Sequence, residues 1–334
     1  ARGMSMAAGA VGDSAMLGLD VSLRDSGSDA ATAARQVEAL AREGAIAVVG
    51  PVSDADVAAV TVVASKEGLP VLSLAPRPRS PGQGVVFHVA QSAEDRARAL
   101  ARYAIRVGAR DVAILAPKSG YGRAVGAAFR AEIEQLGGTV VSAVEYEPGE
   151  TSFGKVVRSV RGPWQAVFVP DQAAKLALIA PALAAGNLQS RPEGKGKTKV
   201  GRPILLLSTA EAVDDRYLRS AGRYSYGAVL APGFYPDRTD AFIARFVDRF
   251  REAFGREPGT WEAHAFDAAL MVRQAVDAGA RSRAEVAAAL AGTPVQGLTG
   301  TLRFGADGMR ADGGLLFTVD KAEGADQYLI RARR

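Results

Sequence analysis

The sequence contains no cysteine, which excludes disulfides, thiolate nucleophiles and cysteine-based metal sites. It contains only two histidines, His88 and His264, and neither lies in a carboxylate-rich spacing that would bind a metal ion. No apolar run approaches the roughly 20 residues that a membrane-spanning helix needs. Because the usual groups of nucleophilic and metal-dependent catalysis are missing, we expect no enzyme, no metal and no cofactor.

Strong charge of one sign is also missing from most of the chain. The formal net charge is +5, and much of it falls in the segment Ser190–Arg202, which carries five basic residues and one glutamate. The rest is nearly neutral, which argues against a nucleic-acid-binding surface. The basic segment contains glycine and proline and favours a solvated loop, with a docking patch for an acidic partner as the alternative. The first ten residues are small and apolar but lack the basic start and cleavage site of a signal peptide.

What is present is a regular alternation of strand and helix patterns over most of 334 residues. Single hydrophobic cores stop growing at about 250–300 residues, so the length predicts two domains. The expected strands are Leu17–Leu23, Ala45–Gly50, Val71–Leu74, Asp111–Leu115, Thr139–Glu145, Ala166–Val169, Ile204–Leu207 and Gly227–Ala231. The expected helices are 30–43, 54–67, 93–107, 122–136, 152–160, 172–185 and 211–221. Successive β-α-β units with short turns predict an α/β fold with parallel, doubly wound sheets.

The pattern changes after Pro236, where three helices follow one another without strands. These helices are expected at 238–254, 260–278 and 282–291. Two strands follow, Gly300–Phe304 and Gly314–Val319, around a turn at Asp307 and Gly308. The helical block must cover a sheet face, so we expect the chain to cross back to the first lobe. The predicted N-terminal lobe is 1–90 plus 236–297, the C-terminal lobe is 91–232 plus 298–334, and 233–235 is a hinge crossover.

Several segments resemble a known family in their order and spacing. They are VVGPVSDADVAAVTVVASKEGLPVLSLAP (Val48–Pro76), KSGYGRAVGAAFRAEIEQLGG (Lys118–Gly138), YSYGAVLAPGFYPD (Tyr224–Asp237) and GLTGTLRFGADG (Gly297–Gly308). Together they are similar to type I periplasmic binding proteins of the branched-chain amino acid receptor kind, and the resemblance covers essentially the whole chain. It implies two doubly wound lobes joined by three crossovers and a small carboxylate-bearing ligand, such as an amino acid, bound in an interlobe cleft. It also implies a periplasmic location, a membrane ABC permease as partner, and no catalysis.

Two features of the resemblance leave alternatives open. The residues PD after AVFV and the IAPAL helix also resemble penicillin-binding protein activator lipoproteins, which would act by contacting a peptidoglycan synthase. The first strand of the family pattern is not found before Met4. We therefore expect that strand, and a signal or lipid-anchor segment, to lie upstream of this sequence.

Candidate ligand contacts in the first lobe follow strand ends, where ligands bind in open α/β sheets. Ser53 follows one strand and begins a helix, and the resemblance implies that its hydroxyl contacts a ligand carboxylate; a plain N-cap is the alternative. Ser73 and Ala75 follow the next strand, where the family uses backbone groups. Arg77 lies where branched-chain amino acid receptors tend to have threonine. It would donate to a more acidic ligand or simply point to water.

Candidate contacts in the second lobe lie at equivalent positions. Tyr121 corresponds to the cleft tyrosine of the family, and Asp171 either reaches the ligand or caps a helix. Glu211 is the candidate partner for a ligand ammonium group, with a carboxylate in the first turn of a helix as the alternative. Phe234 and Tyr235 are expected at a hinge or in a cleft wall.

Overall fold

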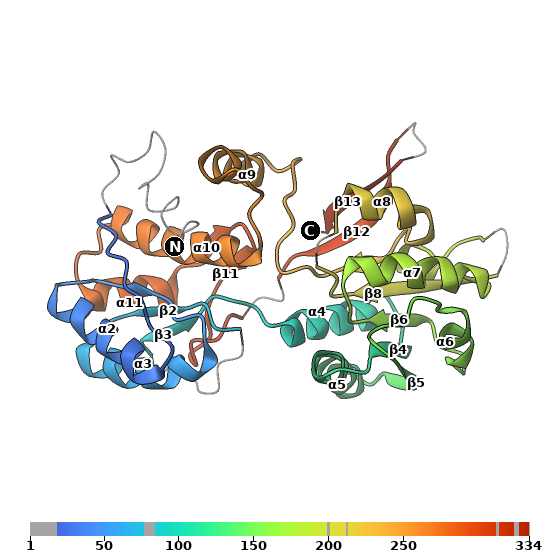
Figure 1. Ribbon diagram of the computed structural model, residues 1–334, viewed down its shortest axis with the longest axis horizontal. Helices are drawn as coiled ribbons and strands as arrows, with labels where there is room; N and C mark the ends of the chain where they lie inside the picture. The colour runs from blue at the N-terminus through green and yellow to red at the C-terminus, as the bar shows by residue number, and fades with distance from the viewer. Residues whose placement is uncertain are drawn as a thin grey trace. The chain divides into compact units, whose positions relative to one another are not determined.

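The computed structural model describes residues 19–76, 84–198, 201–211, 213–311, 314–323 and 327–333. The chain forms two compact units, and it passes from one unit to the other three times (Figure 1). Unit 1 contains Ala1–Ser92 and Arg238–Asp312, and unit 2 contains Ala93–Asp237 and Gly313–Arg334. The α/β class with parallel sheets and three crossovers is therefore confirmed.

Unit 1 is built on a short parallel sheet with strand order β1-β2-β3. Its strands are β1 (Val48–Val49), β2 (Val71–Ser73) and β3 (Val86–His88), and a hairpin of β10 (Val295–Gly297) and β11 (Gly300–Leu302) lies apart from the sheet. Its helices are α2 (Ala30–Arg42), α3 (Asp54–Glu67), α9 (Ala241–Phe254), α10 (Thr260–Asp277) and α11 (Arg283–Gly292). Alternate strand residues serve opposite faces, so Val71 packs with α2 and α3 while Leu72 packs with α10 and α11.

Unit 2 is built on an eight-stranded sheet with the order β13-β12-β9-β8-β6-β4-β5, and β7 pairs with β8. The strands from β9 to β5 and β7 are parallel, whereas β12 and β13 extend the sheet in antiparallel fashion. The strands are β4 (Asp111–Pro117), β5 (Thr139–Tyr146), β6 (Ala166–Val169), β7 (Leu188–Ser190), β8 (Arg202–Ser208), β9 (Val229–Leu230), β12 (Leu316–Lys321) and β13 (Tyr328–Arg333). The helices are α4 (Ala93–Arg106), α5 (Gly120–Gln135), α6 (Gly154–Ser159), α7 (Ala173–Ala185) and α8 (Asp215–Ala221), with 3₁₀ turns η1 (Pro192–Gly194) and η2 (Gly222–Tyr224).

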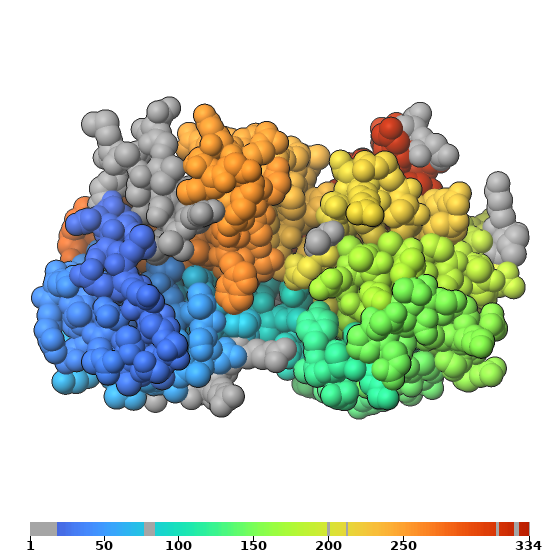
Figure 2. Space-filling view, viewed as in Figure 1, coloured from blue at the N-terminus to red at the C-terminus, as the bar shows by residue number. Residues whose placement is uncertain are grey.

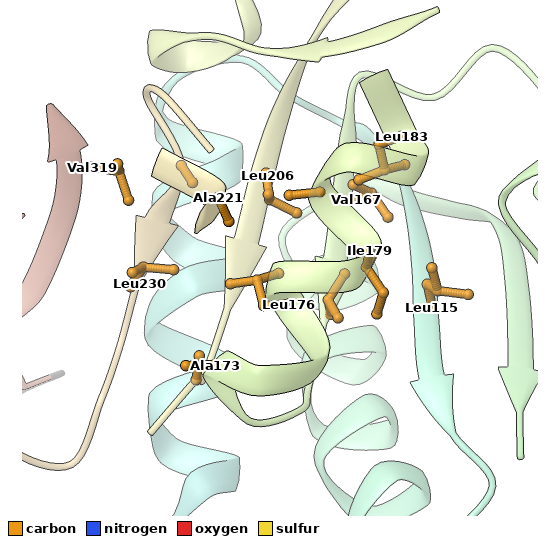
Figure 3. Close-up of a cluster of buried hydrophobic side chains, with 14 of the residues drawn as sticks. Leu115, Val167, Ala173, Leu176, Ile179, Leu183, Leu206, Ala221, Leu230 and Val319 are labelled. Atoms are coloured by element: carbon orange, nitrogen blue, oxygen red, sulfur yellow. The ribbon is translucent and has the colours of Figure 1, made fainter. Parts of the chain in front are cut away.

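The core of unit 2 has two layers, one on each face of its sheet. Leu176, Ile179 and Leu183 of α7 point toward the strands, where Val167 and Leu206 meet them (Figure 3). The atoms of α7 and α8 form part of the surface of unit 2 seen in Figure 2, together with the teal and green segments that precede them in the chain. Helices α4 and α5 pack on the other face, against the alternate residues of the same strands. Runs such as AVFV are apolar throughout because both of their faces are buried.

Local sequence features mark the start of α2 and the end of α3. Asp29 is the N-cap of α2 and accepts a hydrogen bond from the Thr32 amide at 2.8 Å. Gly68 ends α3 in the left-handed conformation, with φ of 57°, which glycine adopts without a steric penalty.

The segment 298–312 was predicted in the second lobe, and the structure places it in unit 1. The two strands predicted on either side of the turn at Asp307 and Gly308 do not pair with each other: β11 pairs with β10, whereas β12 pairs with β9 and β13. The reason is burial, since Leu302 and Phe304 complete the apolar layer over Phe87 of unit 1. The turn at Asp307 and Gly308 instead connects a single bridge between Phe304 and Arg310.

Two further predictions about local structure differ from the structure. The expected strand Leu17–Leu23 has no strand pairing in its described part, 19–23, where Leu19 packs on the core and Leu23 is 57% exposed. The helix expected over 211–221 begins only at Asp215, where Asp214 caps it by accepting from the Tyr217 amide. Among the described residues, no helix is both long and apolar enough to cross a membrane.

Candidate functional site

The candidate residues of unit 2 gather at one edge of its sheet. Tyr121 lies in the first turn of α5, after β4, and Asp171 follows β6 directly. Glu211 follows β8, and the segment 233–235 follows β9. The strands β4, β6, β8 and β9 are parallel, so their carboxyl ends meet at a common edge. The segment 233–235 was predicted as a hinge, and residues 236 and 237 were predicted in the first lobe. All of them belong to unit 2.

An ion pair between Arg96 and Glu211 ties this edge to α4. Arg96 Nη1 lies 2.6 Å from Glu211 Oε1 and also donates to the Ala231 carbonyl at 2.8 Å. The Glu211 carboxylate accepts a further hydrogen bond from the Gly233 amide at 3.1 Å. Arg96 is 7% exposed, whereas the Glu211 side chain is 37% exposed. Glu211 therefore keeps an open side toward solvent while its charge is balanced from within the protein.

Tyr121 presents a partly exposed ring whose hydroxyl is held in place. Its hydroxyl lies 3.1 Å from Thr209 Oγ1, and Thr209 itself is fully buried. The side chain is 38% exposed overall, but burial around the hydroxyl raises the pKa of Tyr121. The phenol thus stays protonated near neutral pH and can both donate and accept a hydrogen bond.

Asp171 is already engaged by its own unit. Its Oδ2 accepts the Tyr146 hydroxyl at 2.6 Å, and its Oδ1 accepts the Gln172 amide at 2.7 Å. Burial, and then the hydrogen bond to Asp171, raise the pKa of Tyr146, which makes Tyr146 a permanent donor. Asp171 is nevertheless partly exposed to solvent.

Two aromatic residues, Phe234 and Tyr235, follow β9, and both are buried or partly buried. Tyr235 packs on Phe317 of β12, with 5.1 Å between ring centroids, and contributes to the core of unit 2. Burial, and then the negative charge of Asp237, raise the pKa of Tyr235 to about 12. Phe234 is 9% exposed.

In unit 1, the loop after β1 brings Ser53 to the edge of the sheet. The Leu74 amide donates to the Pro51 carbonyl at 2.9 Å, so the exits of β1 and β2 are joined. Ser53 occupies the N-cap position of α3, yet its hydroxyl makes no capping hydrogen bond. The first turn of α3 also carries Asp54 and Asp56, which oppose an anion at this helix end. Their charges weaken the electrostatic basis of the predicted carboxylate site at α3.

Ser73 and Ala75 are buried and bonded to each other. Ser73 Oγ accepts the Ala75 amide at 3.2 Å, and both residues are 0% exposed. This hydrogen bond occupies the backbone donor that the sequence assigned to a ligand. Arg77 lies outside the described residues.

The sequence interpretation missed Arg96, Thr209 and Tyr146, which hold the candidate residues of unit 2. A signal for Arg96 was present, because α4 places it on the same buried face as Leu100 and Tyr103, three to four residues apart. An arginine in such an apolar stripe needs a buried acceptor. Within the described part of the chain, no group of three or more acidic or histidine side chains could hold a metal ion.

The comparisons with known proteins agree with this architecture. Residues 6–325 match the model of a family described as periplasmic binding protein, so the chain belongs to that family. Members of this family are ligand-binding receptors that act outside the cytoplasm. The family is defined by ligand binding and not by catalysis. A search among curated proteins found no match to the chain.

Solved structures share the fold along nearly all of the chain. A protein from Rhodospirillum rubrum described as a branched-chain amino acid ABC transporter is 22% identical, with a TM-score of 0.76, 99% of this chain covered and 93% of that one. A Desulfitobacterium hafniense substrate-binding protein in complex with Leu is 20% identical, with a TM-score of 0.59 and coverages of 98% and 94%. A solute-binding protein from R. palustris in complex with benzoate is 17% identical, with a TM-score of 0.58 and coverages of 99% and 89%.

Proposed function

We propose that this protein is a receptor for a small carboxylate-bearing molecule, an amino acid or a related acid, which it delivers to a membrane ABC permease without chemical turnover. The observation that carries the proposal is the set of fixed polar groups at the sheet edge of unit 2, in a chain of the periplasmic binding protein family. The comparisons offer no support for the alternative role as an activator of a peptidoglycan synthase.

The ligand class follows from chemistry that the neighbours have in common. One structural neighbour is in complex with Leu and another with benzoate, and both molecules carry a carboxylate. Only leucine carries an ammonium group. The proposed contacts to the carboxylate are the Ser53 hydroxyl and the Tyr121 hydroxyl, and the proposed contact to an ammonium group is the open side of Glu211.

A thermal-shift panel tests the ligand class. We would compare L-leucine with 4-methylpentanoate, which lacks the amino group, and with L-leucinamide, which lacks the carboxylate; benzoate completes the panel. A ligand at 100 times its Kd should stabilise the protein by about 2.7 kcal/mol. We expect at least one carboxylate to stabilise the protein and L-leucinamide to have no effect. Two outcomes would contradict the proposal. In the first, L-leucinamide alone stabilises the protein; in the second, no acid of a broad panel stabilises it.

Two variants then separate the contacts. Ser53→Ala and Tyr121→Phe each remove one hydroxyl, and a hydrogen bond to a charged group contributes roughly 1.5–3 kcal/mol. Each variant should therefore weaken binding of the carboxylate by about ten- to a hundredfold, as measured by calorimetry. Glu211→Gln should weaken binding of leucine more than binding of 4-methylpentanoate. Equal losses for both ligands would show that Glu211 acts only through its ion pair with Arg96.

A further inference from the structure

A cavity lies in unit 2, and none of the candidate ligand contacts lines it. Its volume is about 730 Å³, within the range of roughly 300–1,000 Å³ that is typical of small-molecule sites. It is lined by one face of α4, by the loop after β7 and by strands β12 and β13. Its polar lining residues are Arg102, Tyr103, Arg106, Glu193, Lys195 and Arg333.

The cavity is strongly basic, because four cationic side chains line it with a single carboxylate. Arg102 forms an ion pair with Glu132 at 2.8 Å, and Lys195 lies 3.8 Å from Glu193. Arg106 and Arg333 have no carboxylate within ion-pair distance among the described residues. The last turn of a helix favours cations, which explains Arg106 at the end of α4. It does not explain Arg333, which comes from β13.

Both of these arginines lie against the ring of Tyr103. The guanidinium carbons of Arg106 and Arg333 are 5.3 Å and 4.8 Å from the ring centroid, so two like charges share one ring. Tyr103 is 2% exposed, and its hydroxyl has no hydrogen-bond partner in the described part of the chain. Arg333 Nη1 also donates to Thr318 Oγ1 at 3.0 Å, but within the described residues neither guanidinium group has a carboxylate partner. An anion bound in the cavity would balance the charge of these two guanidinium groups.

We propose that this cavity binds the phosphate group of a small molecule. Arg106 and Arg333 donate to the phosphate oxygens, and Lys195 adds a charge at the rim. Arginine suits phosphate because its planar guanidinium donates two parallel hydrogen bonds. A cavity of about 730 Å³ has room for a phosphate together with a further group, as in a soluble phosphomonoester or a phospholipid headgroup. This inference is independent of the proposed function.

The test uses the full chain and two phosphate sources. Titration with glycerol 3-phosphate probes a soluble phosphomonoester, and co-sedimentation with phosphatidylglycerol vesicles, against phosphatidylcholine vesicles, probes a headgroup. The double variant Arg106→Gln/Arg333→Gln removes the two guanidinium groups that lack a carboxylate partner among the described residues. The control Arg158→Gln removes an exposed charge from α6, which packs with the opposite layer of the core. Thermal unfolding of each variant verifies that it is folded.

We expect saturable binding to at least one source, weakened at least about tenfold by the double variant and less than about twofold by Arg158→Gln. Binding of glycerol 3-phosphate would identify a soluble ligand, and binding to phosphatidylglycerol vesicles alone would identify a headgroup. Binding to neither source, or equal losses in the double variant and the control, would overturn the site.

Discussion

The sheet edges of the two units differ in the groups that they offer. Unit 2 presents charged and phenolic side chains, each held by a named partner: Glu211 by Arg96, Tyr121 by Thr209 and Asp171 by Tyr146. The described edge of unit 1 presents the Ser53 hydroxyl, without a cap bond, and a buried turn closed by Ser73 and Ala75.

The two units also differ in what a buried charged side chain supports. In unit 2, Arg96 reaches from α4 to the sheet edge and leaves its partner Glu211 open to solvent. In unit 1, Asp267 of α10 is 0% exposed and accepts the Leu298 amide, the Thr299 amide and the Thr299 hydroxyl. Arg310 donates to the Thr299 carbonyl at 2.8 Å. The buried Arg96 therefore holds the partly exposed Glu211 in unit 2. The buried Asp267 holds the turn between β10 and β11 in unit 1.

The largest expected effect comes from breaking the ion pair of unit 2. Arg96→Met removes the cation that pairs with the Glu211 carboxylate and the side-chain donor to the Ala231 carbonyl. Removing one partner of a buried pair costs about 3–5 kcal/mol, and the partial exposure of Glu211 places the expected loss near the lower end. Chemical denaturation of the variant measures this loss.

Arg98→Met is the matched control on the same helix, because Arg98 pairs with Asp95 in a solvent-exposed bridge. Such pairs contribute about 0–1 kcal/mol. If both variants lost the same small amount of stability, the Arg96–Glu211 pair would contribute no more than a solvent-exposed ion pair. The contrast between the buried charges of the two units would then lose its basis in unit 2.

In unit 1, the pH dependence of stability tests the role of the buried side chain of Asp267. Burial is the largest influence on Asp267 and raises its pKa from 3.8 to about 6, despite the hydrogen bonds from Thr299 and Leu298 that act in the opposite direction. The folded protein therefore binds this proton more tightly than the unfolded chain does. The corresponding stability is fully present below about pH 4 and is lost as the pH rises through about 6.

The variant Asp267→Asn isolates this effect from the other carboxylates. The free energy of unfolding of the wild type, minus that of the variant, should increase by about 2–3 kcal/mol as the pH falls from 7 to 4, at 1.36 kcal/mol per pKa unit. Urea denaturation at several pH values measures the difference. A difference that shrinks toward low pH would mean that the hydrogen bonds outweigh burial.

The smallest expected effects compare two helix starts within unit 1. Asp29→Ala removes a capping bond to Thr32 and should cost about 1 kcal/mol. Ser53→Ala removes a hydroxyl without a capping bond, so its effect on stability should stay within about 0.5 kcal/mol. Equal losses of unfolding free energy in the two variants would show that the Ser53 hydroxyl has a structural role.

The sequence by itself determined the local features of this protein. Asp29 and Gly68 mark helix ends because capping depends on neighbouring residues only, and AVFV forms a buried strand because its composition suits a sheet covered on both faces. The order of these elements also carried the family resemblance. The positions of Ser53 and Tyr121 at strand exits followed from that order.

Only the tertiary structure decided which distant groups meet. The pairing of Arg96 with Glu211, the packing of Tyr235 on Phe317 and the burial of Ser73 each depend on strand order and register. The segment 298–312 joined unit 1 because an apolar layer there needed Leu302 and Phe304, which no local pattern reveals. Contacts between residues far apart in sequence depend on how whole layers pack, so periodicity and spacing alone could not assign them.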